Sequence, residues 1–205
     1  HPCHYGASPF TPQFAKFPLV LFSHGLGGNM EMYTELCSQI ASTGCVVAAI
    51  EHEDGSASYA AKVSNSKMGR SSYEEAFIPY KRPLPNKVVP YSRQKVLDMR
   101  TPMLAQRVDE IRAVYDRIST IASGGESGSD DSSPPDSCNN DTSSLLRKII
   151  GVADQNELHL VGHSFGGATQ LLAAQKFISS SASSPPSKPM QAAPPPASSI
   201  KSITV

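Results

Sequence analysis

The sequence has no excess of charge of either sign and no long apolar run. Its 205 residues contain 18 Lys and Arg against 18 Asp and Glu, so it lacks the net positive charge with which proteins attract nucleic acid. No window approaches the roughly 18 consecutive apolar residues that a transmembrane helix needs. We therefore expect neither a nucleic-acid partner nor a transmembrane segment.

Cysteine is scarce as well. The four cysteines, Cys3, Cys37, Cys45 and Cys138, do not stand at metal-ligand spacing. So few cysteines in a chain of this length do not predict a disulfide framework. Cys37 lies in a predicted helix and Cys45 opens a predicted strand, so we expect buried thiols. No charged segment followed by an apolar run marks a secretory leader, which favours a cytoplasmic location.

Apolar strands alternate with helices along the chain. The apolar run 18–23 predicts a buried strand, Asn29 is a suitable cap for a helix that ends at Gly44, and 46–50 predicts a second buried strand. This βαβ pattern implies parallel strands joined by a right-handed crossover. Further elements are predicted as a helix over 96–121 that begins or kinks at Thr101-Pro102, a short helix over 145–150, a strand over 158–161, a helix over 168–178 and a strand over 200–205.

Two tracts are poor in large apolar residues. Residues 123–144 and 179–199 are rich in Ser and Pro, a composition that is typical of disorder. Each lies between elements of the same strand-and-helix pattern. We therefore expect disordered insertions within a single partial domain over 1–205.

The strongest chemical signal is Gly162-His163-Ser164-Phe165-Gly166, between an apolar strand and an alanine-rich helix. In that context G-x-S-x-G predicts the nucleophile elbow of an α/β-hydrolase, where a serine stands on a tight strand-to-helix turn. The turn strains the serine backbone, and Gly162 and Gly166 remove Cβ atoms that would collide there. The alternative is an ordinary glycine-rich turn. We predict that Ser164 is the nucleophile.

A second glycine-rich loop, Ser23-His24-Gly25-Leu26-Gly27-Gly28, follows the first strand. In α/β-hydrolases the loop at this place donates one oxyanion-hole N–H, and the residue after the nucleophile donates the other. Leu26 and Phe165 are the predicted donors. The alternative is a loop whose glycines serve close packing only.

No acid or base follows Ser164. The triad order in this fold is Ser, then Asp or Glu, then His, yet residues 165–205 contain no Asp, Glu or His. None of the six histidines fits the general-base position; they are His1, His4, His24, His52, His159 and His163. His52 has acidic neighbours, so a metal site is conceivable there, but a solvated loop is the favoured interpretation.

Three stretches together resemble the platelet-activating factor acetylhydrolase family, in its plasma and intracellular type II branch. They read FPLVLFSHGLGGNMEMYTELCSQIASTG, VVAAIEHEDGSAS and LVGHSFGGAT. The SHGLGG loop, followed by a helix and VVAAIEH, is far more specific than G-x-S-x-G alone. The helix that contains Arg107 and Ile111 is also similar to the family's helix before the elbow strand. The resemblance covers most of residues 17–122 and 145–178.

The resemblance implies an α/β-hydrolase fold, a mostly parallel sheet with helices on both faces, whose C-terminal third is missing here. It implies a serine esterase that needs no metal or other cofactor. The substrate would be the sn-2 acetyl or short acyl ester of platelet-activating factor-like glycerophospholipids, met at a membrane or lipoprotein surface. Ser164 would be the nucleophile, with Leu26 and Phe165 as the oxyanion hole. In the family, the catalytic Asp directly follows the strand matching SITV, and the His comes later.

Two other interpretations stay open. One is a different α/β-hydrolase, such as a cutinase-like enzyme or a lipase, and the other is a non-catalytic fragment that serves as a binding module. Because the sequence ends at Val205, before any Asp or His of a triad, we expect a fragment with little activity. We also expect it to expose apolar surface and to be poorly soluble.

Overall fold

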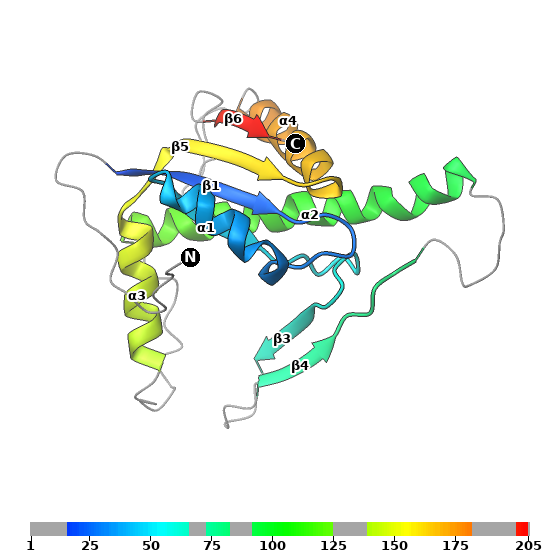
Figure 1. Ribbon diagram of the computed structural model, residues 1–205, viewed down its shortest axis with the longest axis horizontal. Coiled ribbons are helices and arrows are strands. Elements are labelled where there is room, and N and C mark those ends of the chain that lie inside the picture. Colours follow the sequence, from blue (N-terminus) through cyan, green and yellow to red (C-terminus); the bar gives the residue numbers. More distant parts are fainter. Residues whose placement is uncertain (1–15, 66–72, 83–91, 125–138, 182–199, 205) are drawn as a thin grey trace.

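A parallel sheet of four strands organises the molecule (Figure 1). The computed structural model describes residues 16–65, 73–82, 92–124, 139–181 and 200–204. In spatial order the strands are β2 (Val46–Ile50), β1 (Phe17–Ser23), β5 (Ala153–Gly162) and β6 (Ile200–Thr204). Each neighbouring pair is parallel. The predicted α/β class is confirmed.

Helices cover both faces of this sheet. They are η1 (Glu31–Tyr33), α1 (Thr34–Ser42), α2 (Arg93–Ala122), α3 (Asn139–Gly151) and α4 (Phe165–Ser181). In Figure 1, α1 lies in front of the sheet and α2 behind it. The chain leaves β1 for β2 on one side and returns to β5 on the other, and right-handed crossovers in opposite directions place helices on opposite faces. Ligands of such sheets bind at the carboxyl ends of the strands where the direction reverses, here β1 and β5.

The central strand β1 is a continuous apolar run because both of its faces are covered. Leu19 and Leu21 belong to the main core between the sheet and helices α2 and α4. Phe22 contacts the ring of Tyr33, with centroids 4.9 Å apart. The buried members of the main core are Leu19, Leu21, Ile50, Val108, Ile111, Tyr115, Ile118, Ile150, Ala153, Leu158, Leu160, Ala173, Ala174 and Phe177.

Several elements extend beyond their predicted bounds. Helix α2 begins at Arg93 and runs through Pro102. Because proline has no N–H, one carbonyl of the helix lacks its usual donor. Pro102 is exposed, so water can hydrate that carbonyl. Helix α3 begins at Asn139, inside the tract 123–144 that was expected to be disordered, because Asn and Asp suit a helix start. Helix α4 runs to Ser181. The remaining residues of the two tracts, 125–138 and 182–199, lie outside the described residues.

One hairpin was not predicted. Strands β3 (Ala61–Asn65) and β4 (Tyr73–Phe77) pair antiparallel, with Ala61 opposite Phe77, and they project from the sheet in Figure 1. In β3 the sequence AKVSN alternates apolar and polar residues over only four positions, and YEEAF in β4 does not alternate, so neither marks a half-buried strand clearly.

The two described cysteines, Cys37 and Cys45, are free and only partly buried, so the expectation of fully buried thiols was wrong. Helix α1, which carries Cys37, has no fully buried residue, although partial burial raises the pKa of the Cys37 thiol. Cys3 and Cys138 lie outside the described residues.

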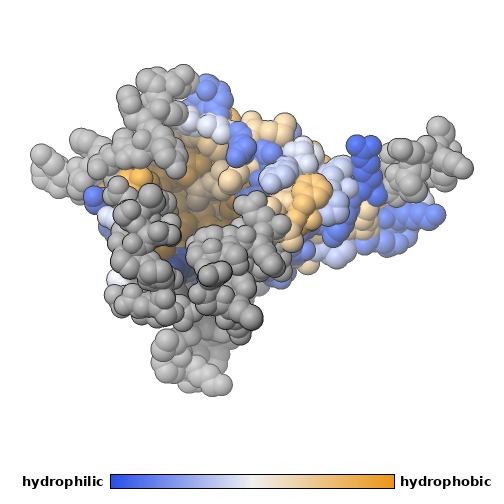
Figure 2. Space-filling model, turned by 90° about the horizontal axis from the view of Figure 1, so that it is seen from below, coloured by the Kyte–Doolittle hydropathy of each residue, from blue (hydrophilic) through white to orange (hydrophobic). Residues whose placement is uncertain are grey.

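The surface is mixed in polarity. Figure 2 shows hydrophobic side chains gathered in a recess of one face, while the projecting end of the molecule is largely hydrophilic. None of the helices in the described ranges combines the length and apolar character needed to cross a bilayer.

Candidate active site

Ser164 stands at the turn between β5 and α4 with a left-handed backbone. Its φ is 56°, the one positive φ of a non-glycine residue in the described part of the chain. Such a conformation costs roughly 1–3 kcal/mol and persists only where the surroundings enforce it. The residue is exposed, so its hydroxyl is open to solvent at the carboxyl edge of the sheet.

Two glycines allow the backbone to close around this turn. A Cβ on Gly162 would lie 2.4 Å from the carbonyl carbon of Gly166, and a Cβ on Gly166 would lie 2.0 Å from the Ser23 oxygen at the end of β1. The His163 amide donates to that same Ser23 oxygen at 3.2 Å. Backbone therefore packs on backbone at both positions, and neither has room for a side chain.

The loop after β1 meets this turn directly. A Cβ on Gly25 would lie 2.9 Å from His163 Nδ1. Within the loop, Gly27 N–H donates to Ser56 O at 2.8 Å and Gly28 N–H to Gly25 O at 3.1 Å. Among the described residues, the amides of Leu26 and Phe165 donate to no protein acceptor. The Leu26 side chain is 41% exposed.

Tyr33 connects the loop and the turn, a role that sequence reasoning missed. Its hydroxyl lies 2.8 Å from His163 Nδ1 and accepts from Gly25 N–H at 3.3 Å. In the sequence, Tyr33 is only one residue of the helix predicted between Asn29 and Gly44. The His163 side chain is thus directed to Tyr33.

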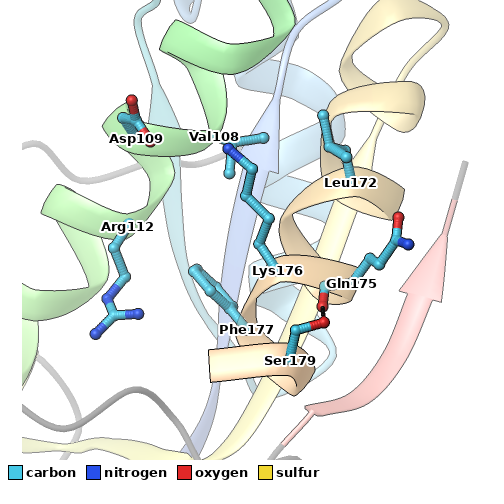
Figure 3. A pocket seen from close by; sticks show the side chains of 8 residues that line it. All are labelled: Val108, Asp109, Arg112, Leu172, Gln175, Lys176, Phe177 and Ser179. Carbon is cyan, nitrogen blue, oxygen red and sulfur yellow. Dashed lines mark hydrogen bonds between the residues drawn. The ribbon is translucent and has the colours of Figure 1, made fainter. Parts of the chain in front are cut away.

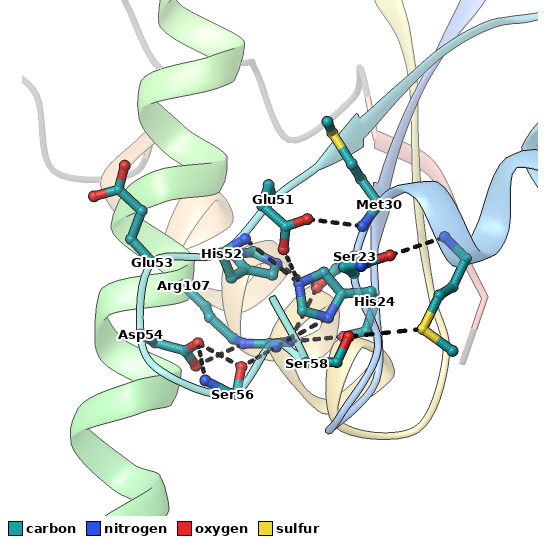
Figure 4. Close-up of polar contacts among 12 residues, drawn as sticks. Ser23, His24, Met30, Glu51, His52, Glu53, Asp54, Ser56, Ser58 and Arg107 are labelled. Atoms are coloured by element: carbon teal, nitrogen blue, oxygen red, sulfur yellow. Dashed lines mark hydrogen bonds and ion pairs between the residues drawn. The ribbon is translucent and has the colours of Figure 1, made fainter. Parts of the chain in front are cut away.

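Beneath the loop lies a set of enclosed polar side chains, here called the buried polar cluster (Figure 4). Each member is at most 1% exposed; the members are Ser23, His24, His52, Asp54, Ser56 and Arg107. The expectation that His52 lies on a solvated loop was therefore wrong. The segment that carries His52 and Asp54 packs against α2. Arg107 of α2 supplies the positive charge that allows Asp54 to be buried.

Arg107 is the centre of this cluster. Its Nε donates to Asp54 Oδ2 and its Nη1 to His24 O, both at 2.8 Å, and its Nη2 donates to Ser56 Oγ. Ser56 in turn donates to Asp54 Oδ1 through its hydroxyl and, at 2.9 Å, through its amide. Burial alone raises the pKa of Asp54, but the Arg107 charge and the Ser56 hydrogen bonds outweigh it and hold that pKa below its usual value.

Ser23, His52 and Glu110 form a chain of hydrogen bonds in the order of a catalytic triad. Ser23 Oγ lies 2.7 Å from His52 Nε2, and His52 Nδ1 lies 2.6 Å from Glu110 Oε2. Ser23 and His52 are 0% exposed, so no substrate reaches them. Burial, reinforced by the Arg107 charge, lowers the pKa of His52 to about 2, which makes it a poor base. Burial raises the pKa of Glu110.

The described histidines leave Ser164 without a partner base. His24 Nδ1 donates to Gly25 O at 2.9 Å and orders the loop. His159 sits within β5, opposite Val20 and Ser202. His1 and His4 lie outside the described residues. The described residues also contain no group of three His, Cys, Asp or Glu side chains that is arranged to hold a metal ion.

A groove opens between α2 and α4, away from Ser164 (Figure 3). It is lined by Val108, Asp109, Arg112, Leu172, Gln175, Lys176, Phe177 and Ser179. These α4 residues lie at least two turns beyond the helix N-terminus at which Ser164 stands. The groove therefore has no part in chemistry at the serine.

A model of the family described as platelet-activating factor acetylhydrolase, isoform II, matches residues 1–183. A putative phospholipase A2 of Schizosaccharomyces pombe is 31% identical over 173 residues, which cover 82% of this chain and 37% of that protein.

Two vertebrate relatives are similar to about the same degree. The platelet-activating factor acetylhydrolase of Gallus gallus is 32% identical over 80% of this chain and 36% of its own length. That of Bos taurus is 31% identical over 75% of this chain and 31% of its own length. The chain thus spans about a third of the length of these curated relatives.

Proposed function

Because this chain belongs to the platelet-activating factor acetylhydrolase family, isoform II, we propose that the protein is a serine esterase that cleaves a short acyl group from phospholipids. The substrate is the sn-2 acetyl or short acyl ester of a platelet-activating factor-like glycerophospholipid, met at a membrane or lipoprotein surface. The vertebrate relatives bear the name of that activity. No cofactor takes part in the proposed reaction.

The observation that carries this proposal is the backbone of Ser164. A positive φ of 56° at an exposed serine, kept by two glycines without room for a Cβ, is a costly arrangement for an ordinary turn. It is the geometry that a nucleophile elbow needs, because it lifts the hydroxyl above the sheet edge. The helix that begins at Phe165 places its positive end beneath the hydroxyl.

In the proposed mechanism, Ser164 Oγ gives its proton to a base and attacks the ester carbonyl. The bond between the acyl carbon and the sn-2 oxygen then breaks, the lysophospholipid leaves as an alcohol with that proton, and the acyl group stays on the serine. The negative charge that develops on the carbonyl oxygen is stabilised by the amides of Leu26 and Phe165, whose N–H groups have no protein acceptor among the described residues. Loss of one such donor costs roughly 3 kcal/mol of transition-state stabilisation. Water then releases the acyl group and restores the serine.

The base that takes the Ser164 proton does not come from the described histidines, since His24 and His52 are buried and His163 is directed to Tyr33. We propose that the 205-residue chain by itself is a very poor esterase. An oxyanion hole without a triad retains about 10³–10⁴-fold acceleration over water.

The test is hydrolysis of 1-alkyl-2-acetyl-glycerophosphocholine by the protein as its full gene encodes it, beside Ser164→Ala. We expect turnover in the wild type and none in the variant. A long-chain triacylglycerol and a polyester film, run in parallel, separate the proposed activity from that of a lipase or a cutinase-like enzyme. Equal inertness of both proteins toward all three substrates would refute the esterase and favour a binding module.

A further inference from the structure

Arg107 contacts both parts of the proposed oxyanion hole. Its Nη1 donates at 2.8 Å to His24 O, two residues before the Leu26 amide. Its guanidinium carbon lies 4.8 Å from the ring centroid of Phe165, the residue that carries the other amide. The two loops are more than 130 residues apart in sequence, and Arg107 bridges them from a third element, α2.

The Arg107 side chain also contacts Ser56, whose backbone is hydrogen-bonded to the first loop. Arg107 donates to Ser56 Oγ, and the Ser56 carbonyl accepts the Gly27 amide at 2.8 Å. The Ser58 amide donates to Gly28 O at 3.0 Å. Gly27 and Gly28 are therefore held by backbone groups of the segment 56–58, and Arg107 and its partner Asp54 both bond to Ser56 of that segment.

The guanidinium is suited to this task by its geometry. It is fully buried and offers a planar fork whose donors reach an acid, a hydroxyl and a carbonyl at once. A lysine ammonium in the same place is a single point and cannot reach all three. The face of the Arg107 guanidinium remains available for the Phe165 ring, and an aromatic ring attracts a cation stacked on it.

We propose that Arg107 is a positioning residue that aligns the Leu26 and Phe165 amides as one oxyanion hole. It acts through His24 O, Ser56 and the Phe165 ring and does not touch the substrate. This inference rests on the proposed esterase function. It predicts that the alignment depends on the shape of the guanidinium as well as on its charge.

The experiment compares Arg107→Lys and Arg107→Ala with wild type in the protein as its full gene encodes it, on the acetyl phospholipid. A misplacement of about 1 Å can cost 10²-fold in rate, so we expect kcat to fall about 10- to 100-fold in both variants, with KM changed less than about threefold. The rate of phosphonylation of Ser164 by an organophosphonate should fall in parallel, because its tetrahedral adduct occupies the same hole. Methylguanidinium should restore part of the activity of Arg107→Ala.

Arg112→Ala is the matched control. Arg112 also belongs to α2, pairs with Asp116 at 2.9 Å and lies over a ring, that of Phe177. We expect its kcat to stay within about twofold of wild type. If Arg107→Ala fails to fold, Arg107→Lys and Phe165→Leu, which removes the ring but keeps the amide, still test the alignment.

The outcomes separate the two proposals. Folded Arg107 variants that keep kcat within twofold of wild type, or a loss that only follows the folded fraction, would overturn the role of Arg107 while the esterase stands. A wild type that neither hydrolyses the phospholipid nor reacts with the phosphonate would overturn the esterase itself, and the inference with it.

Discussion

At the scale of single residues, the site depends on glycines, which have no Cβ atom. Gly166 lies against Ser23 O, and Gly162 lies against Gly166, so the tight turn at Ser164 depends on two absent Cβ atoms. The buried polar residues depend instead on groups that are present: Arg107 and Asp54 are paired with each other, and His52 is hydrogen-bonded to Ser23 and Glu110.

Gly166→Ala should disrupt the turn. Its Cβ would stand 2.0 Å from the Ser23 carbonyl oxygen, a backbone atom that cannot move aside without shifting β1. We expect a loss of roughly 3 kcal/mol in the free energy of unfolding, measured by urea denaturation, together with loss of Ser164 phosphonylation.

Gly151→Ala serves as the control for that change. Nothing lies within 4 Å of a Cβ at Gly151, which is the last residue of α3, so we expect an effect of less than about 1 kcal/mol. Equal stability of the two variants would contradict the close packing described for Gly166.

His52 should make stability depend on pH. The pKa of His52 is lowered to about 2 in the folded chain and is about 6.5 in the unfolded chain. Below pH 6.5 the unfolded chain therefore binds a proton at His52, and the folded chain does not. Stability is therefore lost as the pH falls below about 6.5, by at most about 1.4 kcal/mol per pH unit.

His52→Gln should remove that slope. The raised pKa of Glu110 acts with the opposite sign, so the contribution of His52 is the difference between wild type and variant in urea unfolding at pH 7, 6 and 5. Parallel stability curves for the two proteins would show that His52 is not held neutral.

At the scale of elements, helix α2 has two halves with different roles. Its middle presents Val108, Ile111 and Tyr115 to the core and Arg107 to the buried polar cluster. Its first two turns are mostly exposed and project from the body in Figure 1. Pro102 lies where the halves meet and removes one hydrogen bond of the helix.

Pro102→Ala should strengthen the projecting half. A proline inside a helix is about 3 kcal/mol less favourable than alanine, so restoring the N–H should slow amide hydrogen exchange over residues 93–101. Thr101→Ala, a neighbouring change at another exposed helical position, restores no hydrogen bond and should leave exchange nearly unchanged. Equal exchange in wild type and Pro102→Ala would show that the proline does not limit this half.

At the scale of the whole molecule, several large apolar side chains of the described residues are exposed on the helices. Leu36 on α1 is 42% exposed, Leu171 on α4 is 50% exposed and Ile178 is 48% exposed. A parallel sheet is stable when both of its faces are covered. Among the described residues, helix α1 covers one face of this sheet, yet none of its residues is fully buried.

The 205-residue chain, expressed alone, should therefore bind a hydrophobic dye and associate in solution, because exposed apolar surface promotes association. Dye fluorescence and light scattering, compared with the protein as its full gene encodes it, would check this. A monodisperse chain with one cooperative unfolding transition would contradict the expectation.

The amino-acid sequence by itself was enough to predict the family, the parallel sheet and the order of its strands and covering helices along the chain, but not the hairpin of β3 and β4. These properties follow from local patterns: apolar runs such as 18–23, helical spacing in α2 and α4, and the glycines around Ser164. The positions of the proposed nucleophile and oxyanion donors came from the same patterns and stay predictions.

Only the tertiary structure decided what surrounds them. It brought Arg107 beneath His24, buried His52 between Ser23 and Glu110, and directed Tyr33 to His163. These contacts join residues 29 to 130 positions apart, and no local pattern specifies such partners. They depend on which helix covers which face of the sheet, and burial then makes each polar group require the others.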